Sequence, residues 1–269
     1  MNDPDLYAKS NSFQKVTAQK ILSEYSHLFQ WRDFDSMLDI GCGTGDATIE
    51  SILPLLPTKS NRLIGCDISS EMIDYARKYN CNPNISYQVL DVSGDVDEFV
   101  MKFGSFDHVI SSFCLHWIRD QYAVMKNISK LLTATGDCLL VFITWSPIYT
   151  VHLEMSKSPK WSQYMKDVER FISPYYESIS PADDLRVMLQ TVGFTDRDIQ
   201  ERESRYLYDN YDDFANFVRS INPFVERIPA SERKDFVTDL AKRTMLKNKE
   251  INGMEYLDVA SILVVYARK

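Results

Sequence analysis

The chain has 269 residues, of which 45% are hydrophobic and 25% are charged. This length and composition fit one folded domain with insertions and exclude extended disorder. Acidic residues outnumber basic ones by 38 to 30, so the chain has no general attraction for nucleic acid or anionic lipid, and we expect neither as a partner. No segment reaches the roughly 20 apolar residues of a membrane span. Residues 1–10 lack a secretory signal pattern, so we expect a cytoplasmic protein.

The first half of the chain alternates between predicted helices and strands. Apolar positions at helical spacing predict an amphipathic helix over residues 11–29, ahead of the first strand. Strands are then predicted at 37–40, 62–66, 85–90, 106–111 and 137–143, with helices at 46–56, 70–79, 95–102 and 121–131 between them. Because each right-handed crossover between parallel strands needs a helix, this alternation predicts a doubly wound α/β sheet covered on both faces.

The alternation stops after residue 143. Residues 144–180 are rich in Trp, Tyr, Pro and Met and predict irregular helices. Later helices are predicted at 181–191, 212–220 and 231–246, and later strands at 202–208 and 259–267. We therefore expect a single domain over residues 1–269 with a helical substrate-binding cap. Its core comprises 33–143, 181–208 and 258–269, and its cap comprises 1–32, 144–180 and 209–257.

A glycine-rich turn follows the first predicted strand. Glycines let backbone amides approach a ligand closely at the carboxyl end of a strand, where open α/β sheets bind their ligands. The spacing is GxGxG with Asp39 two residues upstream, whereas dinucleotide-binding turns are GxGxxG and hold a pyrophosphate at a helix N-terminus. An acid at this place suits the ammonium group of S-adenosylmethionine, although Asp39 could also cap a turn. The turn residues expected at the cofactor are Gly41, Cys42, Gly43 and Gly45.

Two further acids end the second and third predicted strands. Asp67 is placed to accept hydrogen bonds from both ribose hydroxyls, and Asp91 from the adenine amino group. Either acid alone could be a helix cap. Three acids at the ends of successive strands converge on one crevice, however, and this favours a ligand site. The apolar residues expected around the adenine ring are Ile68, Met72 and Val92.

The residues after the fourth predicted strand should form the rim of this crevice. Ser112 is expected to contact the cofactor, and an aromatic residue there would stabilise a sulfonium by cation–π attraction of ~0.5–2 kcal/mol. Trp117 can also be read as a core residue. His116 can be read either as a functional residue or as a surface cap.

The motifs DIGCGTG, GCDIS followed by EMIDYAR, and VLDV resemble those of class I S-adenosylmethionine-dependent methyltransferases over residues 37–143. The resemblance implies a Rossmann-like, seven-stranded, mostly parallel sheet whose last strand, here 259–267, runs antiparallel to the others. It also implies the cofactor contacts given above.

A narrower resemblance covers almost the whole chain. Residues 7–14, 114–117, 146–149 and 160–175 are similar to those of insect juvenile hormone acid O-methyltransferases. That family transfers a methyl group to the carboxylate of farnesoic acid or juvenile hormone acid. The resemblance implies that Gln14 and Trp117 place this carboxylate. One departure is a Tyr175-Tyr176 pair where Tyr-His is expected, and it bears on the substrate more than on the reaction.

An acceptor carboxylate is ionised at neutral pH, so we expect Gln14 and Trp117 to act by hydrogen bonding and His116 to orient rather than remove a proton. Aromatic residues in 145–176 and 214–224 could line an apolar tunnel, and the expected acceptor contacts there are Ile148, Tyr149 and Met165. We expect no metal, since no cluster has ligand spacing.

Several alternatives stay open at this point. The acceptor could be another small acid, a fatty acid or an amine, or the chain could bind the cofactor without catalysis. A dehydrogenase fits less well, because the glycine spacing and the upstream acid both differ from the dinucleotide pattern. A homodimer is compatible with the sequence.

Overall fold

The computed structural model describes residues 3–57, 62–254 and 256–269. Its centre is a seven-stranded sheet in the order β3-β2-β1-β4-β5-β7-β6, in which β7 pairs antiparallel with both β5 and β6. This confirms the predicted mostly parallel sheet with an antiparallel last strand. The strands are β1 (Ser36–Ile40), β2 (Arg62–Asp67), β3 (Ile85–Val89), β4 (Phe106–Ser112), β5 (Leu132–Trp145), β6 (Asp196–Leu207) and β7 (Leu257–Arg268).

The strand β1 lies inside the sheet because it is apolar on both faces. Leu38 is fully buried and aligns with Ile64 of β2 and Val109 of β4. Alternate residues of β1 enter two separate cores: Met37 packs with α2 (Ser12–Tyr25), and Leu38 packs on the opposite face. A strand buried on both faces is the expected place for an apolar run in a parallel sheet.

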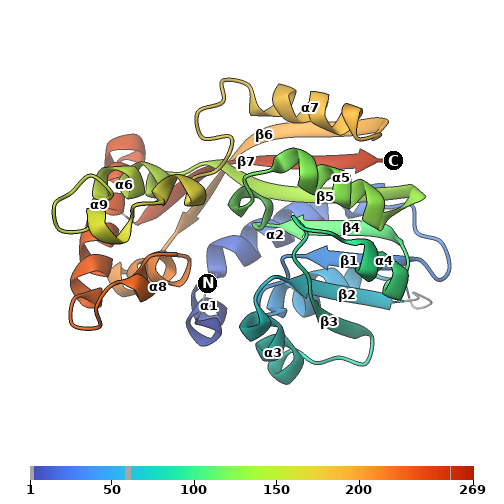
Figure 1. Cartoon of the computed structure of the whole chain (residues 1–269), viewed down its shortest axis with the longest axis horizontal. Helices are drawn as coiled ribbons and strands as arrows, with labels where there is room; N and C mark the ends of the chain where they lie inside the picture. The colour runs from blue at the N-terminus through green and yellow to red at the C-terminus, as the bar shows by residue number, and fades with distance from the viewer. Residues whose placement is uncertain (1–2, 58–61, 255) are drawn as a thin grey trace.

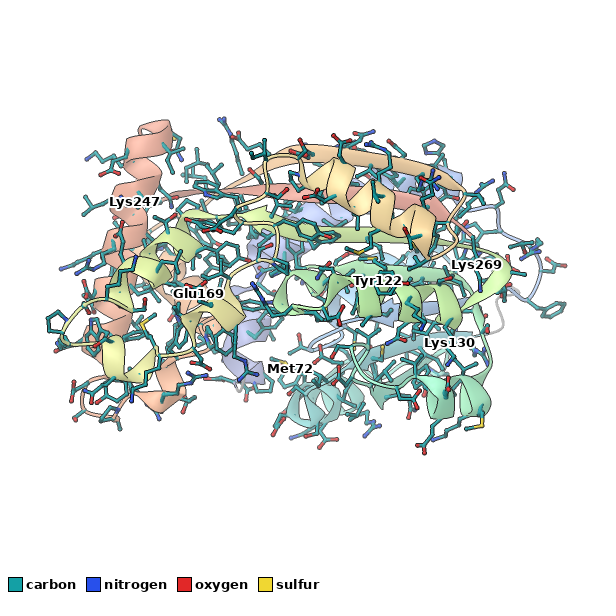
Figure 2. The ribbon with its side chains drawn as sticks, turned by 45° about the horizontal axis from the view of Figure 1, so that its top comes forward. Met72, Tyr122, Lys130, Glu169, Lys247 and Lys269 are labelled. Atoms are coloured by element: carbon teal, nitrogen blue, oxygen red, sulfur yellow. The ribbon has the colours of Figure 1, made fainter. Side chains whose placement is uncertain are left out.

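Helices cover both faces of the sheet. One face carries α2 and α3 (Ser70–Tyr79), and the other carries α4 (Asp97–Phe103), α5 (Gln121–Leu131) and α7 (Pro181–Thr191). Figure 2 shows the second of these faces, where Tyr122 and Lys130 mark α5. The doubly wound arrangement is therefore confirmed.

Three of the remaining helices gather beyond the carboxyl ends of the parallel strands (Figure 1). They are α6 (Pro147–Met155), α8 (Tyr211–Ser220) and α9 (Arg233–Asn252), and α9 packs against both others. The short α1 (Pro4–Ser10) contacts α8 and α3, so it bridges this group and the sheet. The division of the chain into a core and a cap stays a prediction. Within the described residues, no helix is both long and apolar enough to span a membrane.

Three predicted elements differ from the structure. The strand predicted over 137–143 is the longer β5, which begins at Leu132 and ends at Trp145. The expected helix over 46–56 is a π-helical turn, Thr48–Ile52, followed by a 3-10 turn, Leu53–Leu55. Pro54 lies in this segment and lacks the N–H that a continuing α-helix needs. The edge strand β6 begins at Asp196, six residues before its predicted start, because its charged residues conceal the strand pattern and its pairing with β7 decides its conformation.

Candidate active site

The glycine turn after β1 has the conformation that its sequence predicts. Gly41, Gly43 and Gly45 have φ values of +76°, +53° and +78°, in the left-handed region that favours glycine. The N–H groups of Gly41 and Cys42 both donate to the carbonyl oxygen of Cys66, at 2.7 and 2.9 Å, which ties the turn to the end of β2. The turn is thus fixed by backbone contacts before any ligand is considered.

Asp39 lies beneath this turn. Its carboxylate accepts a hydrogen bond from Thr48 Oγ1 at 2.6 Å, and the residue is only 4% exposed. Burial raises the pKa of Asp39 to about 7. A buried carboxyl group with this pKa is stabilised as the anion by a nearby cation, so it fits the ammonium group of the cofactor.

Asp67 connects the end of β2 to the same turn. Its two carboxylate oxygens accept hydrogen bonds from the N–H groups of Gly43, at 3.0 Å, and Ser69, at 2.9 Å. Burial raises the pKa of Asp67. Each oxygen keeps a second acceptor position, so the carboxylate can still receive the two hydroxyls of a ribose.

The adenine end of the expected site is more open. Asp91 is exposed, and its Oδ1 accepts from both the N–H and the hydroxyl of Ser93, at 2.9 and 2.6 Å, so it does cap a turn. Its Oδ2 accepts no hydrogen bond within this turn. Ile68 is 66% exposed, while Met72 and Val92 are 1% and 5% exposed. Ile68 is therefore the residue of this apolar set with most surface to offer an adenine ring.

Two cavities meet beside the glycine turn. The first, which we call the inner cavity, has a volume of about 460 Å³ including its opening and is lined in part by Asp39, Gly41, Cys42 and Ser112. The second, the outer cavity, has a volume of about 580 Å³ including its opening. Their common walls are Tyr7, Gln14 and Phe113. Both His116 and Trp117 line the outer cavity.

Gln14 lies at the junction of these cavities, on the first turn of α2. Asn11 is the residue just before this helix. Its Nδ2 donates a hydrogen bond to Asp46 at 2.7 Å, which fixes the start of α2. The Oε1 atom of Gln14 is buried and has no hydrogen-bond partner among the described residues. This oxygen can accept a hydrogen bond from a ligand at the point where the two cavities join, whereas only Nε2 of the same amide can donate one to a carboxylate.

His116 is a neutral hydrogen-bond donor. It is 3% exposed, and burial lowers its pKa to about 3. Its Nδ1 accepts from the N–H of Ile143 at 3.4 Å, which leaves the proton on Nε2. Its ring lies 5.0 Å from that of Trp117. The geometry thus favours orientation over proton removal as the role of His116.

Several wall residues were not singled out as site residues from the sequence, although Phe113 lies in the segment that was expected to form the rim. Phe113 has a φ of +56°, which is unusual for a bulky residue, and its N–H donates to the carbonyl oxygen of Val141 at 2.7 Å. Its ring meets that of Phe13 edge to face at 5.4 Å. Tyr7 was visible only within the narrower resemblance. His152 and Asp258, which also line the outer cavity, gave no motif signal.

Only some of the residues expected to contact the acceptor line the outer cavity. Ile148 and Tyr149 line the outer cavity, as the sequence predicts. Met165 is 1% exposed in the apolar core and lines neither of these two cavities, so a substrate contact there stays a prediction. Among the described residues, no group of three or more His, Cys, Asp or Glu side chains could hold a metal ion.

Comparisons with known proteins agree with this geometry. Residues 37–136 match the family described as a methyltransferase domain. The juvenile hormone acid O-methyltransferase of Bombyx mori is 37% identical, with 100% of this chain and 98% of the relative covered. That of Drosophila melanogaster is 35% identical, with 100% and 93% covered.

Solved structures that are similar to this chain have the same fold. The YcgJ protein of Bacillus subtilis has a TM-score of 0.58 at 16% identity, over 93% of this chain and 98% of that one. At such identity the likeness concerns the fold alone. The full-length relatives, the glycine turn and the strand-end acids together show that the chain belongs to the juvenile hormone acid O-methyltransferase family of class I S-adenosylmethionine-dependent methyltransferases.

Proposed function

We propose that this O-methyltransferase esterifies the carboxylate of a sesquiterpenoid acid, farnesoic acid or juvenile hormone acid. The observation that carries the proposal is the junction at Gln14, where the inner cavity meets an outer cavity with apolar walls. Two full-length relatives are named for juvenile hormone acid, which supports the same acceptor here. Phe13, Ile148 and Phe217 contribute the apolar surface that a hydrocarbon chain requires.

The reaction requires placement more than proton transfer. When bound, S-adenosylmethionine supplies a methyl group on a positively charged sulfur. The acceptor carboxylate, with an ordinary pKa near ~4, is already the nucleophile at pH 7. Gln14 and the Nε2–H of His116 can each donate a hydrogen bond to it, and the indole N–H of Trp117 is a third donor on the same wall. Holding the reacting atoms in line can supply ~7–11 kcal/mol of the barrier.

We expect the apolar part of the walls to reduce contact between the bound carboxylate and water. A dry environment strengthens the hydrogen bonds that orient it, because they act at a low local dielectric. Tyr7 closes one side of both cavities and lies within van der Waals reach of the position a Cβ would take on Gly43, at 3.4 Å. This side chain therefore covers the glycine turn.

The proposal is tested with purified protein, labelled methyl donor and a panel of acids. Farnesoic acid and juvenile hormone acid should give labelled methyl esters, whereas labelled ester from saturated fatty acids alone would contradict the acceptor. Gln14→Ala and Trp117→Ala should each lower turnover by ~10-fold or more, because each removes an oriented donor. Unchanged kinetics in both variants would refute their roles. A cytoplasmic location, absence of nucleic-acid binding and a homodimer are further expectations that this assay leaves untouched.

A further inference from the structure

Asp46 is a buried carboxylate directly after Gly45, the last residue of the glycine turn. Its Oδ1 accepts a hydrogen bond from Thr44 Oγ1 at 2.9 Å, and its Oδ2 accepts one from Asn11 Nδ2 at 2.7 Å. Both partners are buried as well. One oxygen of this carboxylate therefore binds the turn expected to hold the cofactor, and the other binds the N-terminal helices.

Asn11 is the corner between these two helices, since it is the one residue between Ser10, which ends α1, and Ser12, which begins α2. Tyr7 of α1 and Gln14 of α2 lie on either side of it, and both line the two cavities. A contact that fixes this corner therefore fixes two residues at once. One covers the glycine turn, and the other is expected to bind the carboxylate of the acceptor.

The side chains at the start of α2 are not used for helix capping. An asparagine just before a helix usually accepts a hydrogen bond from one of its first N–H groups, and a glutamine three residues later can bond back to it. Asn11 makes no such cap hydrogen bond within the described residues, and Gln14 Oε1 has no partner there. The side chain of Asn11 binds Asp46 instead. This pattern indicates that the contact serves the site rather than the helix.

Lys15 connects the same region to a second acid. Its Nζ lies 2.6 Å from Glu50 and 3.7 Å from Asp46. The side chain of Glu50 is 54% exposed, so water screens its ion pair with Lys15. Asp46 is buried and also binds Thr44 and Asn11. Glu50 is therefore a matched control for Asp46, because it is an acid on the same lysine but at the surface.

We propose that Asp46 is a positioning residue for methyl transfer, which acts through Asn11 to hold Tyr7 and Gln14 against the glycine turn. The acceptor and the cofactor are then placed from one common point. In-line attack requires the reacting atoms to be ~3–3.5 Å apart, and a displacement of ~1 Å can lower the rate ~100-fold. This inference rests on the proposed function for the reaction, but it does not depend on which acid is methylated.

The test exchanges the two ends of the buried hydrogen bond. Asn11→Asp places two carboxylates against each other, so kcat for the acid that the wild-type protein methylates best should fall about tenfold or more. Adding Asp46→Asn gives position 46 a donor for the new carboxylate and keeps an acceptor for Thr44. This paired variant should recover most of kcat. Glu50→Gln should keep the wild-type kcat, and calorimetry should show that S-adenosylhomocysteine still binds all three proteins.

The recovery separates positioning from a general loss of stability. Wild-type kcat in Asn11→Asp, or no recovery in a folded paired variant, overturns the inference. Weaker binding of S-adenosylhomocysteine in Asp46→Asn that persists in the paired variant overturns it too, because Asp46 is then a cofactor ligand. Should the charged variants fail to fold, Asn11→Ala and Asp46→Ala are combined in a double-mutant cycle. Their losses of kcat should not add, and additive losses contradict the proposal.

Failure of the proposed function is recognised separately. If the wild-type protein methylates no acid in the panel, that function fails, and amide hydrogen exchange then tests the corner without an acceptor. Residues 3–16 should lose protection in Asn11→Asp and regain it in the paired variant, because the same hydrogen bond is broken and restored. Equal protection in the wild-type protein and Asn11→Asp overturns the inference.

Discussion

Gly41 is the position where the glycine turn has least room for a side chain. A Cβ atom there would lie 2.3 Å from the Cβ and 2.4 Å from the Sγ of Cys114, and the backbone φ is +76°. The left-handed backbone alone costs about 1–2 kcal/mol for alanine. Overpacking against Cys114 adds about 1–3 kcal/mol, so Gly41→Ala should lower the free energy of unfolding by about 2–5 kcal/mol.

Gly193 provides the matched control. Its φ is +100°, but nothing lies within 4 Å of the position its Cβ would take. Gly193→Ala should therefore cost only the backbone part, about 1–2 kcal/mol. For a protein of this size, each kcal/mol lowers Tm by about 2–4 °C. Calorimetry should also show that Gly41→Ala loses affinity for S-adenosylhomocysteine, because the turn must shift, whereas Gly193→Ala retains it.

The clash can be separated from the backbone strain. Cys114→Ala removes Sγ but keeps the Cβ of the 2.3 Å contact, so it should rescue Gly41→Ala less than Cys114→Gly, which removes both clashing atoms and should recover more of the Tm. The clash at Gly41 would be refuted if Gly41→Ala and Gly193→Ala lowered Tm equally and if Cys114→Ala and Cys114→Gly restored the same part of that loss.

Three other predictions follow from the hydrogen bonds and pKa values of the site. Asp67→Ala should raise the Kd of S-adenosylhomocysteine about tenfold or more by calorimetry, because it removes an acceptor that also holds Gly43; Asp91→Ala should have the smaller effect. With a pKa of about 3, His116 stays neutral, so kcat should be flat between pH 6 and 9; a limb near pH 6.5 would indicate a base. The pKa of His152, about 3 when folded and ~6.5 when unfolded, means that it stabilises the protein above pH 6.5 and that this is lost as pH falls. The free energy of unfolding should therefore fall less between pH 6.5 and 5 in His152→Phe than in the wild-type protein, by up to about 1.4 kcal/mol per pH unit. The same pH dependence in both proteins would contradict the lowered pKa of His152.

The alternation of strands and helices and the position of the cofactor site could be predicted from local patterns. The GxGxG turn needs positive φ values at Gly41, Gly43 and Gly45, and each has one. Asp39 and Asp67 lie beside that turn because the carboxyl ends of adjacent parallel strands must meet. These features depend on neighbouring residues and on strand direction, which a single sequence contains.

The outer cavity could not be predicted in the same way. Ile148 and Met165 are both apolar and both lie in the segment after β5, yet one faces the cavity and the other the core. The difference depends on how α6 and the following 3-10 turns pack, which no spacing rule fixes. The positive φ of Phe113 is likewise imposed by tertiary contacts. The contact between His152 and Asn222 is likewise visible only once both residues are placed in the fold.

The common wall of the two cavities has a consequence for inhibition. Because Tyr7, Gln14 and Phe113 border both spaces, a single compound that joins a nucleoside to a hydrocarbon chain can fill them together. Its second half then binds at a high effective concentration, and the tethered molecule exceeds the affinity of either half alone. Neither half alone would have this advantage, so the length of the connecting group becomes the variable that decides potency.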